Sequence, residues 1–192
     1  MRDGVVTHTG VWLFARRVVL ARCCPLAQFH YVLHDSETTV ARNDIDRLPL
    51  LEAVERMEQV FVGPLNPERE IELGLFKLRI PQYPIEGVRE AVLNALTHRD
   101  YLNPGEILVR HSAQELVVTS PGGFVAGITP ENILRHEAVP RNRTLANALV
   151  KLRLVESSGI GRRRIFRSAL VYGKRRPQYQ TDGYTVTLRL FN

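Results

Sequence analysis

Three polar residues between positions 90 and 98 have types and a spacing that could do chemistry. Glu90, Asn94 and His98 recur every four positions, which places them along one side of an α-helix. A carboxylate can orient or deprotonate water, and an amide oxygen can ligate a hard cation such as Mg²⁺. From the spacing alone, the alternative is the polar outer face of an amphipathic helix, whose side chains form only local hydrogen bonds.

The helix that would position these residues has clear signals at its start and along its apolar side. Pro84 is a residue type favoured at the first helical position, and the pattern runs to about Arg99. The opposite side of this helix is filled by Val88, Ala91, Val92, Ala95 and Leu96. The sequence therefore predicts a helix with one buried face and one chemically equipped face.

Two short glycine-containing segments form a second group of candidates. Segment 120–123 follows a predicted strand, and segment 158–161 precedes a predicted helix. Glycine lets backbone N–H groups approach a phosphate, and a helix N-terminus adds a favourable dipole. The glycines are Gly122, Gly123, Gly159 and Gly161. Taken singly, each segment is also explained as a tight turn.

The positive charge of the chain is concentrated in its C-terminal third. The net charge is +6, and segment 141–176 holds eleven basic residues against one acid, Glu156. Such a cluster favours a polyanionic partner, either nucleic acid or nucleotide phosphates, with Arg162, Arg163 and Arg164 as the candidate contacts. The alternative is a solvated basic helix face.

The remaining pattern predicts an α+β protein with helices packed on an antiparallel-looking sheet, that is, a two-layer α/β sandwich. We expect helices over 48–62, 84–99, 143–153 and 162–171, a helix beginning at Thr129, and strands over 31–33, 71–80, 107–109, 115–119 and 184–190. The best boundary is the proline pair Pro81 and Pro84. We therefore expect a small N-terminal α+β region over residues 1–80 and a second domain over residues 81–192.

Composition excludes several classes of protein. A chain of 192 residues with 44% apolar and 24% charged residues is typical of a globular protein. No apolar run approaches the roughly 18 residues of a membrane helix, and no signal peptide is evident, so we expect a cytoplasmic protein without membrane contact. The only cysteines, Cys23 and Cys24, are adjacent and are expected to be buried free thiols.

Residues 84–179 resemble the histidine-kinase-like (GHKL) ATPase domain of bacterial RecG-related ATP-dependent DNA helicases and transcriptional regulators. The resemblance is carried, in order and spacing, by segments 88–101, 120–124, 140–142 and 155–161. Segment 10–14 is similar to the stretch that joins an N-terminal Schlafen/AlbA-like domain to the ATPase domain in such proteins. The resemblance implies a Bergerat-like two-layer fold and a C-terminal fragment whose residues 1–80 connect to that missing domain.

The resemblance also implies roles for the candidate residues. Glu90 would be the base that activates water, and Asn94 the Mg²⁺ ligand. His98 and Ser120 would line the nucleotide site, Gly122 and Gly123 would flank the base, and Gly159 and Gly161 would lie under the phosphates. The implied cofactors are ATP and Mg²⁺.

This sequence departs from the family pattern at Ser120, where GHKL ATPases have an aspartate that accepts a hydrogen bond from the adenine amino group. Loss of that charge-assisted bond removes roughly 1.5–3 kcal/mol. We therefore expect a nucleotide-binding module of a DNA-associated regulator or helicase-like protein, with weak hydrolysis at most.

Two alternatives remain open from the sequence. Residues from about 130 to 192 also fit a winged-helix DNA-binding module, in which Arg162, Arg163 and Arg164 contact phosphates and the last hairpin is the wing. A degenerate GHKL fold that serves as a homodimerisation scaffold is the second alternative. The candidate partners are thus a nucleotide, DNA and a second copy of the chain.

Overall fold

The computed structural model describes residues 5–62, 65–125, 127–156 and 159–192. The helices are α1 (His8–Phe14), α2 (Arg17–Cys23), α3 (Leu50–Val62), α4 (Ile85–His98), α5 (Arg143–Lys151) and α6 (Ile160–Val171). The strands are β1 (Phe29–His34), β2 (Val40–Asp46), β3 (Glu68–Leu73), β4 (Phe76–Pro81), β5 (Ile107–His111), β6 (Glu115–Pro121), β7 (Gln178–Thr181) and β8 (Thr185–Phe191).

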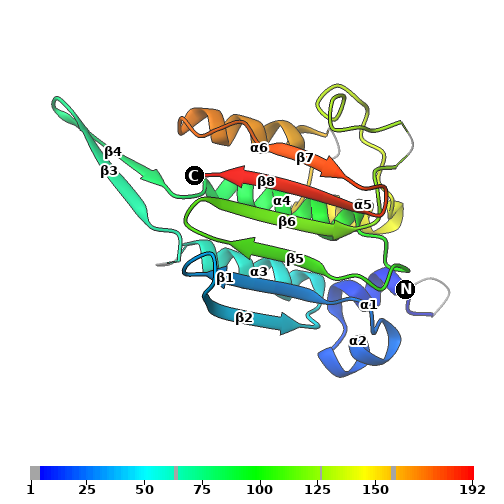
Figure 1. Ribbon diagram of the computed structural model, residues 1–192. Coiled ribbons are helices and arrows are strands. Elements are labelled where there is room, and N and C mark those ends of the chain that lie inside the picture. The colour runs from blue at the N-terminus through cyan, green and yellow to red at the C-terminus, as the bar shows by residue number, and fades with distance from the viewer. Residues whose placement is uncertain (1–4, 63–64, 126, 157–158) are drawn as a thin grey trace.

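Six of the strands form one mixed sheet in the order β2-β1-β5-β6-β8-β7. Strand β1 is parallel to β5, and every other neighbouring pair is antiparallel. The helices α3, α4 and α6 lie behind the sheet as it is drawn in Figure 1. The predicted two-layer α+β class is therefore confirmed.

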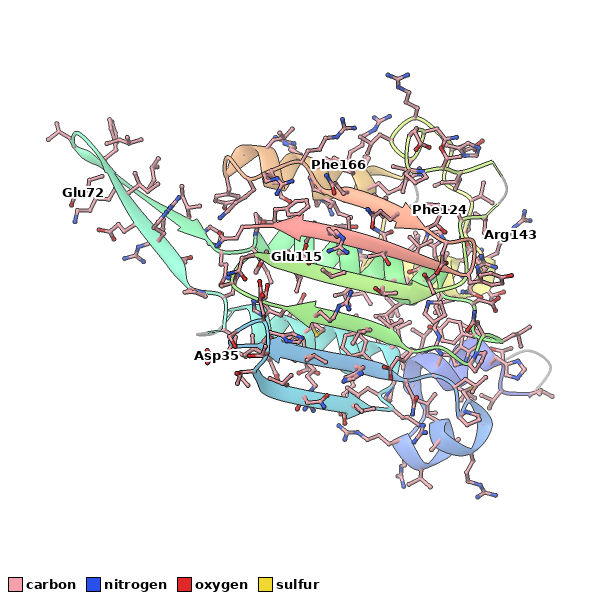
Figure 2. All side chains as sticks on the ribbon, viewed as in Figure 1. Asp35, Glu72, Glu115, Phe124, Arg143 and Phe166 are labelled. Carbon is pink, nitrogen blue, oxygen red and sulfur yellow. The ribbon has the colours of Figure 1, made fainter. Side chains whose placement is uncertain are left out.

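Alternation along the strands explains which face of the sheet carries the core. In β6, Leu116, Val118 and Ser120 are buried toward the helices, because side chains two positions apart lie on the same face. On the opposite face, Glu115 pairs with Arg189 of β8 at 2.7 Å, and Figure 2 shows Glu115 on that side of the sheet. The core thus lies between one sheet face and the helices, with α4 at its centre.

The predicted division into residues 1–80 and 81–192 is wrong as a structural boundary. Strands β1 and β2 belong to the same sheet as β5–β8, and α3 packs against α4. The Trp12 ring stacks on Tyr101, with ring centroids 3.8 Å apart. One hydrophobic core joins both halves of the chain, because neither half alone covers the sheet.

Two smaller expectations were also wrong. Residues 130–135 form turns rather than a helix, since the Asn132 side chain accepts a hydrogen bond from Thr129 N at 2.8 Å and donates one to Gly127 O at 2.7 Å. These side-chain bonds satisfy the backbone locally and compete with a helix. Cys23 is exposed, whereas Cys24 is half-buried and accepts a hydrogen bond from Trp12 Nε1.

The winged-helix alternative for residues 130–192 does not describe this fold. Strand β8 pairs with β6 along its whole length, and α6 packs against α4. A wing is a hairpin at the edge of a small helical domain, whereas β8 is an interior strand of the six-stranded sheet. Residues 130–192 are therefore an inseparable part of the larger two-layer structure.

Arg99, directly after α4, fastens that helix to the beginning of β1 and β5. Its side chain is buried, and its guanidinium donates hydrogen bonds to the backbone carbonyls of Gln28, Leu26 and Gly105. Asn142 Nδ2 in turn donates to the carbonyl oxygens of Thr97 and Arg99. These bonds fix the end of α4 relative to the sheet.

We predict that Arg99→Leu lowers the free energy of unfolding by about 3 kcal/mol, because three buried carbonyl groups lose their donor. Urea unfolding followed by circular dichroism measures the change. Arg163→Leu is the matched control, because Arg163 is exposed and is expected to change stability by less than about 0.5 kcal/mol. Equal stability of Arg99→Leu and the control would contradict the role assigned to Arg99.

Candidate functional site

A cavity of about 240 Å³ lies between α4, the sheet, α6 and the segment that follows β6. Helix α4 presents one polar side to it, because Glu90, Asn94 and His98 follow the helical repeat. The predicted stripe of polar residues is therefore a wall of a cavity and not an outer surface.

The structure brings together at this cavity all eight residues that were predicted at α4 and at the glycine segments. They are Glu90, Asn94, His98, Ser120, Gly122, Gly123, Gly159 and Gly161. Ser157 and Ser158, which precede the second glycine pair, lie outside the described residues. Segments more than sixty positions apart in the sequence thus meet at one site.

The three arginines of the basic cluster do not form one surface. Arg162 lines the cavity and is half-buried, and its Nη2 donates a hydrogen bond to His136 O at 2.9 Å. Arg163 is exposed and points elsewhere, because successive helical residues are about 100° apart. Arg164 forms ion pairs with the carboxylates of Glu90 and Glu156. As a single group of phosphate contacts, the prediction was therefore wrong.

The Glu90 carboxylate is buried and paired with a cation. Arg164 Nη1 donates to Glu90 Oε1 at 2.6 Å, and Arg164 Nη2 donates to Glu156 Oε1 at 2.6 Å. A Cβ atom at Gly161 would overlap the Glu90 carboxylate, so a larger residue there would displace that side chain. Both acids that line the cavity are thus neutralised by one arginine.

Asn94 carries an unsatisfied polar atom. Its Nδ2 is buried and has no hydrogen-bond partner among the residues that the structure describes. A buried amide donor without a partner costs about 1–3 kcal/mol, so such atoms are rare unless a ligand or water completes them. The amide at Asn94 is therefore available to a bound molecule.

His98 is held in its neutral form. Burial, together with the nearby guanidinium groups of Arg162 and Arg141, lowers its pKa to about 4. Burial also lowers the pKa of the Arg162 guanidinium. Near neutral pH, this part of the cavity thus holds one uncharged imidazole and one partly buried cation.

Ser120 stands at the end of the cavity beside α4. Its hydroxyl donates a hydrogen bond to Ala95 O at 3.0 Å. Because that bond uses the hydroxyl hydrogen, the lone pairs of the Ser120 oxygen remain as hydrogen-bond acceptors. Ser120 therefore keeps an acceptor, without charge, where the family pattern has a carboxylate.

The first glycine pair has structural reasons of its own. Gly122 has φ +96°, a conformation that favours glycine, and its N–H donates to Tyr184 O at 2.7 Å. A Cβ atom at Gly123 would overlap the backbone of Gly183. The pair lets the segment after β6 turn across the end of β8 and so closes one side of the cavity.

An apolar wall of the cavity was missed by the sequence analysis. The ring centroid of Tyr179 on β7 lies 6.1 Å from that of Phe124 and 6.2 Å from that of Phe166. Other apolar residues of the lining are Val118, Val125, Ile128, Ile133, Val139, Val150, Val155, Val186 and Leu188. An isolated Tyr in a short polar strand carries no local signal, so its position could be learned only from the fold.

We predict that His98 makes stability fall as the pH is lowered from about 6.5 toward 4. The pKa of His98 is lower in the folded chain than in the unfolded chain. Below pH 6.5 the unfolded chain therefore binds the proton first, which lowers its free energy relative to the folded state. His98→Gln should therefore lose less unfolding free energy than the parent between pH 7.5 and pH 5, by on the order of 1 kcal/mol.

Urea unfolding at the two pH values measures this difference. His111 is buried and also has a pKa lowered to about 4, so His98→Gln keeps part of the pH dependence, whereas a double variant with His111→Gln should lose most of it. A parent protein and His98→Gln with identical pH dependence would contradict the assignment.

The chain has a two-layer α+β fold with a cavity between a central helix and glycine-bearing segments. Residues 105–190 match the model of a family described as "Putative ATP-dependent DNA helicase recG C-terminal". This match confirms the predicted resemblance for this part of the chain and indicates an ATPase-like module similar to the C-terminal part of RecG-type helicases.

A solved structure gives the same fold. The crystal structure of the DIP2311 protein from Corynebacterium diphtheriae is similar over 100% of this chain, with a TM-score of 0.84 and 28% sequence identity. The chain covers 38% of that protein's length. No curated protein matches the chain. The family match begins after α4, so Glu90, Asn94 and His98 lie outside it.

Two further findings bear on ligands and membranes. Among the described residues, no three His, Cys, Asp or Glu side chains gather where they could hold a metal ion. In the same part of the chain, every helix is too short or too polar to cross a bilayer.

Proposed function

We propose that the cavity binds ATP together with Mg²⁺ and that this chain is a nucleotide-binding module with slow hydrolysis. The observation that carries the proposal is the convergence of the candidate residues on one cavity whose α4 wall includes Asn94, whose buried Nδ2 has no partner among the described residues. The match of residues 105–190 to the family model of RecG-related helicase C-termini supports the same ligand.

The lining of the cavity offers different groups for the base and for the phosphates of a nucleotide. Val118 and Tyr179 contribute to an apolar wall that would accept the base, with the Ser120 hydroxyl oxygen as an acceptor for its amino group. Arg162 and the N-terminus of α6, which begins after Gly159, would attract the phosphates.

Among the described residues, Asn94 is the candidate Mg²⁺ ligand of the cavity. Its side-chain oxygen is a ligand type that Mg²⁺ accepts, and this ion commonly takes one or two protein ligands together with substrate phosphates and water. When bound, Mg²⁺ would neutralise phosphate charge. The absence of a three-residue metal cluster among the described residues is compatible with this arrangement.

Slow hydrolysis follows from the state of Glu90. A general base must reach the attacking water with a free lone pair. Here one oxygen of Glu90 accepts from Arg164 at 2.6 Å, and the side chain is almost fully buried. That oxygen is committed to the ion pair that joins α6 to α4, which restricts the use of this carboxylate as a base for water.

We predict that Mg²⁺ and ATP together raise the melting temperature of the chain and that Asn94→Ala weakens this binding at least tenfold. A ligand at one hundred times its Kd stabilises the folded state by about 2.7 kcal/mol. Differential scanning fluorimetry with ATP, with and without Mg²⁺, measures the effect. Asn94 is off the apolar face of α4, so its variant is expected to fold.

Asn43→Ala is the matched control, because Asn43 is an exposed amide on β2 at the far edge of the sheet. Retained affinity in Asn94→Ala, or no stabilisation of the parent at millimolar ATP, would count against the proposal. Phosphate release measured on the same samples separates binding from turnover.

A second candidate function is the binding of nucleic acid by the exposed face of α6 and the segment after it. Arg163, Arg167, Arg175 and Arg176 are exposed, and none forms an ion pair with a described residue. Arg175 and Arg176 are instead stacked over the rings of Phe191 and Phe166. Cations without acidic neighbours favour a polyanionic partner.

We predict that Arg163→Ala with Arg167→Ala weakens the binding of duplex DNA and reduces the slope of log affinity against log salt by about 2, one unit for each lost phosphate contact. Fluorescence anisotropy at several salt concentrations measures the slope. The control is Arg16→Ala with Arg22→Ala, two exposed arginines near the N-terminus. An unchanged slope in the α6 variant would exclude this face as the DNA contact.

A further inference from the structure

The β3–β4 hairpin is an arm that projects from the body of the molecule (Figure 1). Its two strands pair only with each other, and none of its side chains belongs to the hydrophobic core of the described residues. A two-stranded hairpin is at best marginally stable in water when nothing packs against it. The arm therefore needs an explanation that the nucleotide site does not provide.

The base of the arm is fixed rigidly to the body. Asn66 is buried, and its amide side chain donates to Tyr83 O at 2.8 Å and accepts from Tyr83 N at 2.7 Å. Tyr83 is itself fully buried, and its hydroxyl donates to Ser112 O at 2.7 Å. The arm is thus held in one direction and not tethered loosely.

One face of the arm is charged and satisfies its own charges. Residues directly opposite in the register share a face, which places Glu70 beside Arg79 and Glu72 beside Lys77. Lys77 Nζ lies 3.1 Å from both Glu70 and Glu72, and Figure 2 shows Glu72 on this arm. With three acids and three bases over residues 68–81, the arm has no net charge.

The other face of the arm is apolar and uncovered. The register places Ile71 opposite Leu78, Leu73 opposite Phe76, and Arg69 opposite Ile80 on this face. Exposed fractions are 57% for Leu73, 74% for Phe76 and 47% for Leu78, and Leu75 at the tip is 100% exposed. A strand pair that is amphipathic in this way is typical of one buried against another surface.

We propose that this apolar face packs against the same face of a second copy of the chain, so that two arms form the centre of a homodimer. A twofold interface must be self-complementary, and a strip that is apolar from Ile71 and Leu78 to the tip, with its one charged residue, Arg69, at the base of the arm, meets that condition. Neutrality of the arm argues against a strongly charged partner such as nucleic acid.

The available area is sufficient for such an interface. Large exposed side chains of this kind give an apolar patch on the order of 500 Å² on each chain. Two facing copies then bury roughly 1,000 Å² in total, which is the lower end of the range for a specific interface. The dimer is therefore expected to dissociate at low concentration, and its affinity should depend steeply on the arm.

The test is sedimentation velocity on the 192-residue chain from 1 to 100 µM. The parent is expected to reach twice the 21.8 kDa chain mass as concentration rises. Phe76→Lys with Leu78→Lys should raise the dimer Kd at least a hundredfold, because two charges on each copy would be buried against charges of the same sign. Its melting temperature should stay that of the parent monomer, since the arm contributes nothing to the core.

Leu102→Lys is the matched control, because Leu102 is 90% exposed in the turn after α4 and is not on the arm. It should leave the dimer unchanged. A parent that is monomeric throughout the range would overturn the proposal and would point to a different protein or another part of a longer chain as the partner of the arm. Unchanged dimerisation of the arm variant would overturn it as well.

Hydrogen exchange gives a second readout that does not depend on a variant. Backbone amides over residues 68–81 should exchange more slowly at 100 µM than at 1 µM, while amides of β5 and β6 should not change. A dimer whose concentration-dependent protection lies elsewhere would exclude the arm as the interface. Neither experiment uses a nucleotide, so the proposal can fail or succeed separately from the proposed function.

Discussion

The ion pair between Glu90 and Arg164 is the interaction on which the arrangement of the site depends. Helix α4 is buried by the sheet on one side and by α3 and α6 on others, so a carboxylate on it cannot remain without a partner. Arg164 supplies that partner from α6, and Gly161 leaves the space that the carboxylate requires. The pair thus joins α4 to α6 at the wall of the cavity.

Because Arg164 pairs with the acids of the lining, the cavity keeps two chemically different groups of residues, one cationic and one apolar. One arginine neutralises both acids of the lining, so the cation that remains at the start of α6, Arg162, has no acidic partner among the described residues. Tyr179, with Phe124 and Phe166 as ring neighbours, adds an apolar wall to the same cavity. The cavity thus combines an apolar wall with a helix N-terminus and a half-buried cation. This combination is complementary to a flat ring that carries phosphates.

Local patterns predicted the elements well and their assembly less well. The helical spacing of Glu90, Asn94 and His98 and the apolar alternation of β8 are properties of a short segment, and both were confirmed. The position of β1 beside β5 is a pairing between distant segments, which no local pattern reports. Pro81 and Pro84 lie at the base of the β3–β4 arm. Prolines at this position predict an interruption of secondary structure, which here is the end of the arm and not a domain boundary. The ion pairs of Arg164 were likewise invisible, since a run of three arginines does not reveal which one faces a carboxylate.

Ser120 shows how the proposed module would differ from an efficient ATPase. A neutral hydroxyl acceptor contributes about 0.5–1.5 kcal/mol to a hydrogen bond, against roughly 1.5–3 kcal/mol for a carboxylate. The difference corresponds to about tenfold less preference for a base that carries an amino group. One oxygen of Glu90, the proposed base, is also held by Arg164. The first feature would weaken binding of the base and the second would slow hydrolysis, so the proposed ligand would act here by joining α4, the segment after β6 and α6 into one stable unit and not by releasing the energy of hydrolysis.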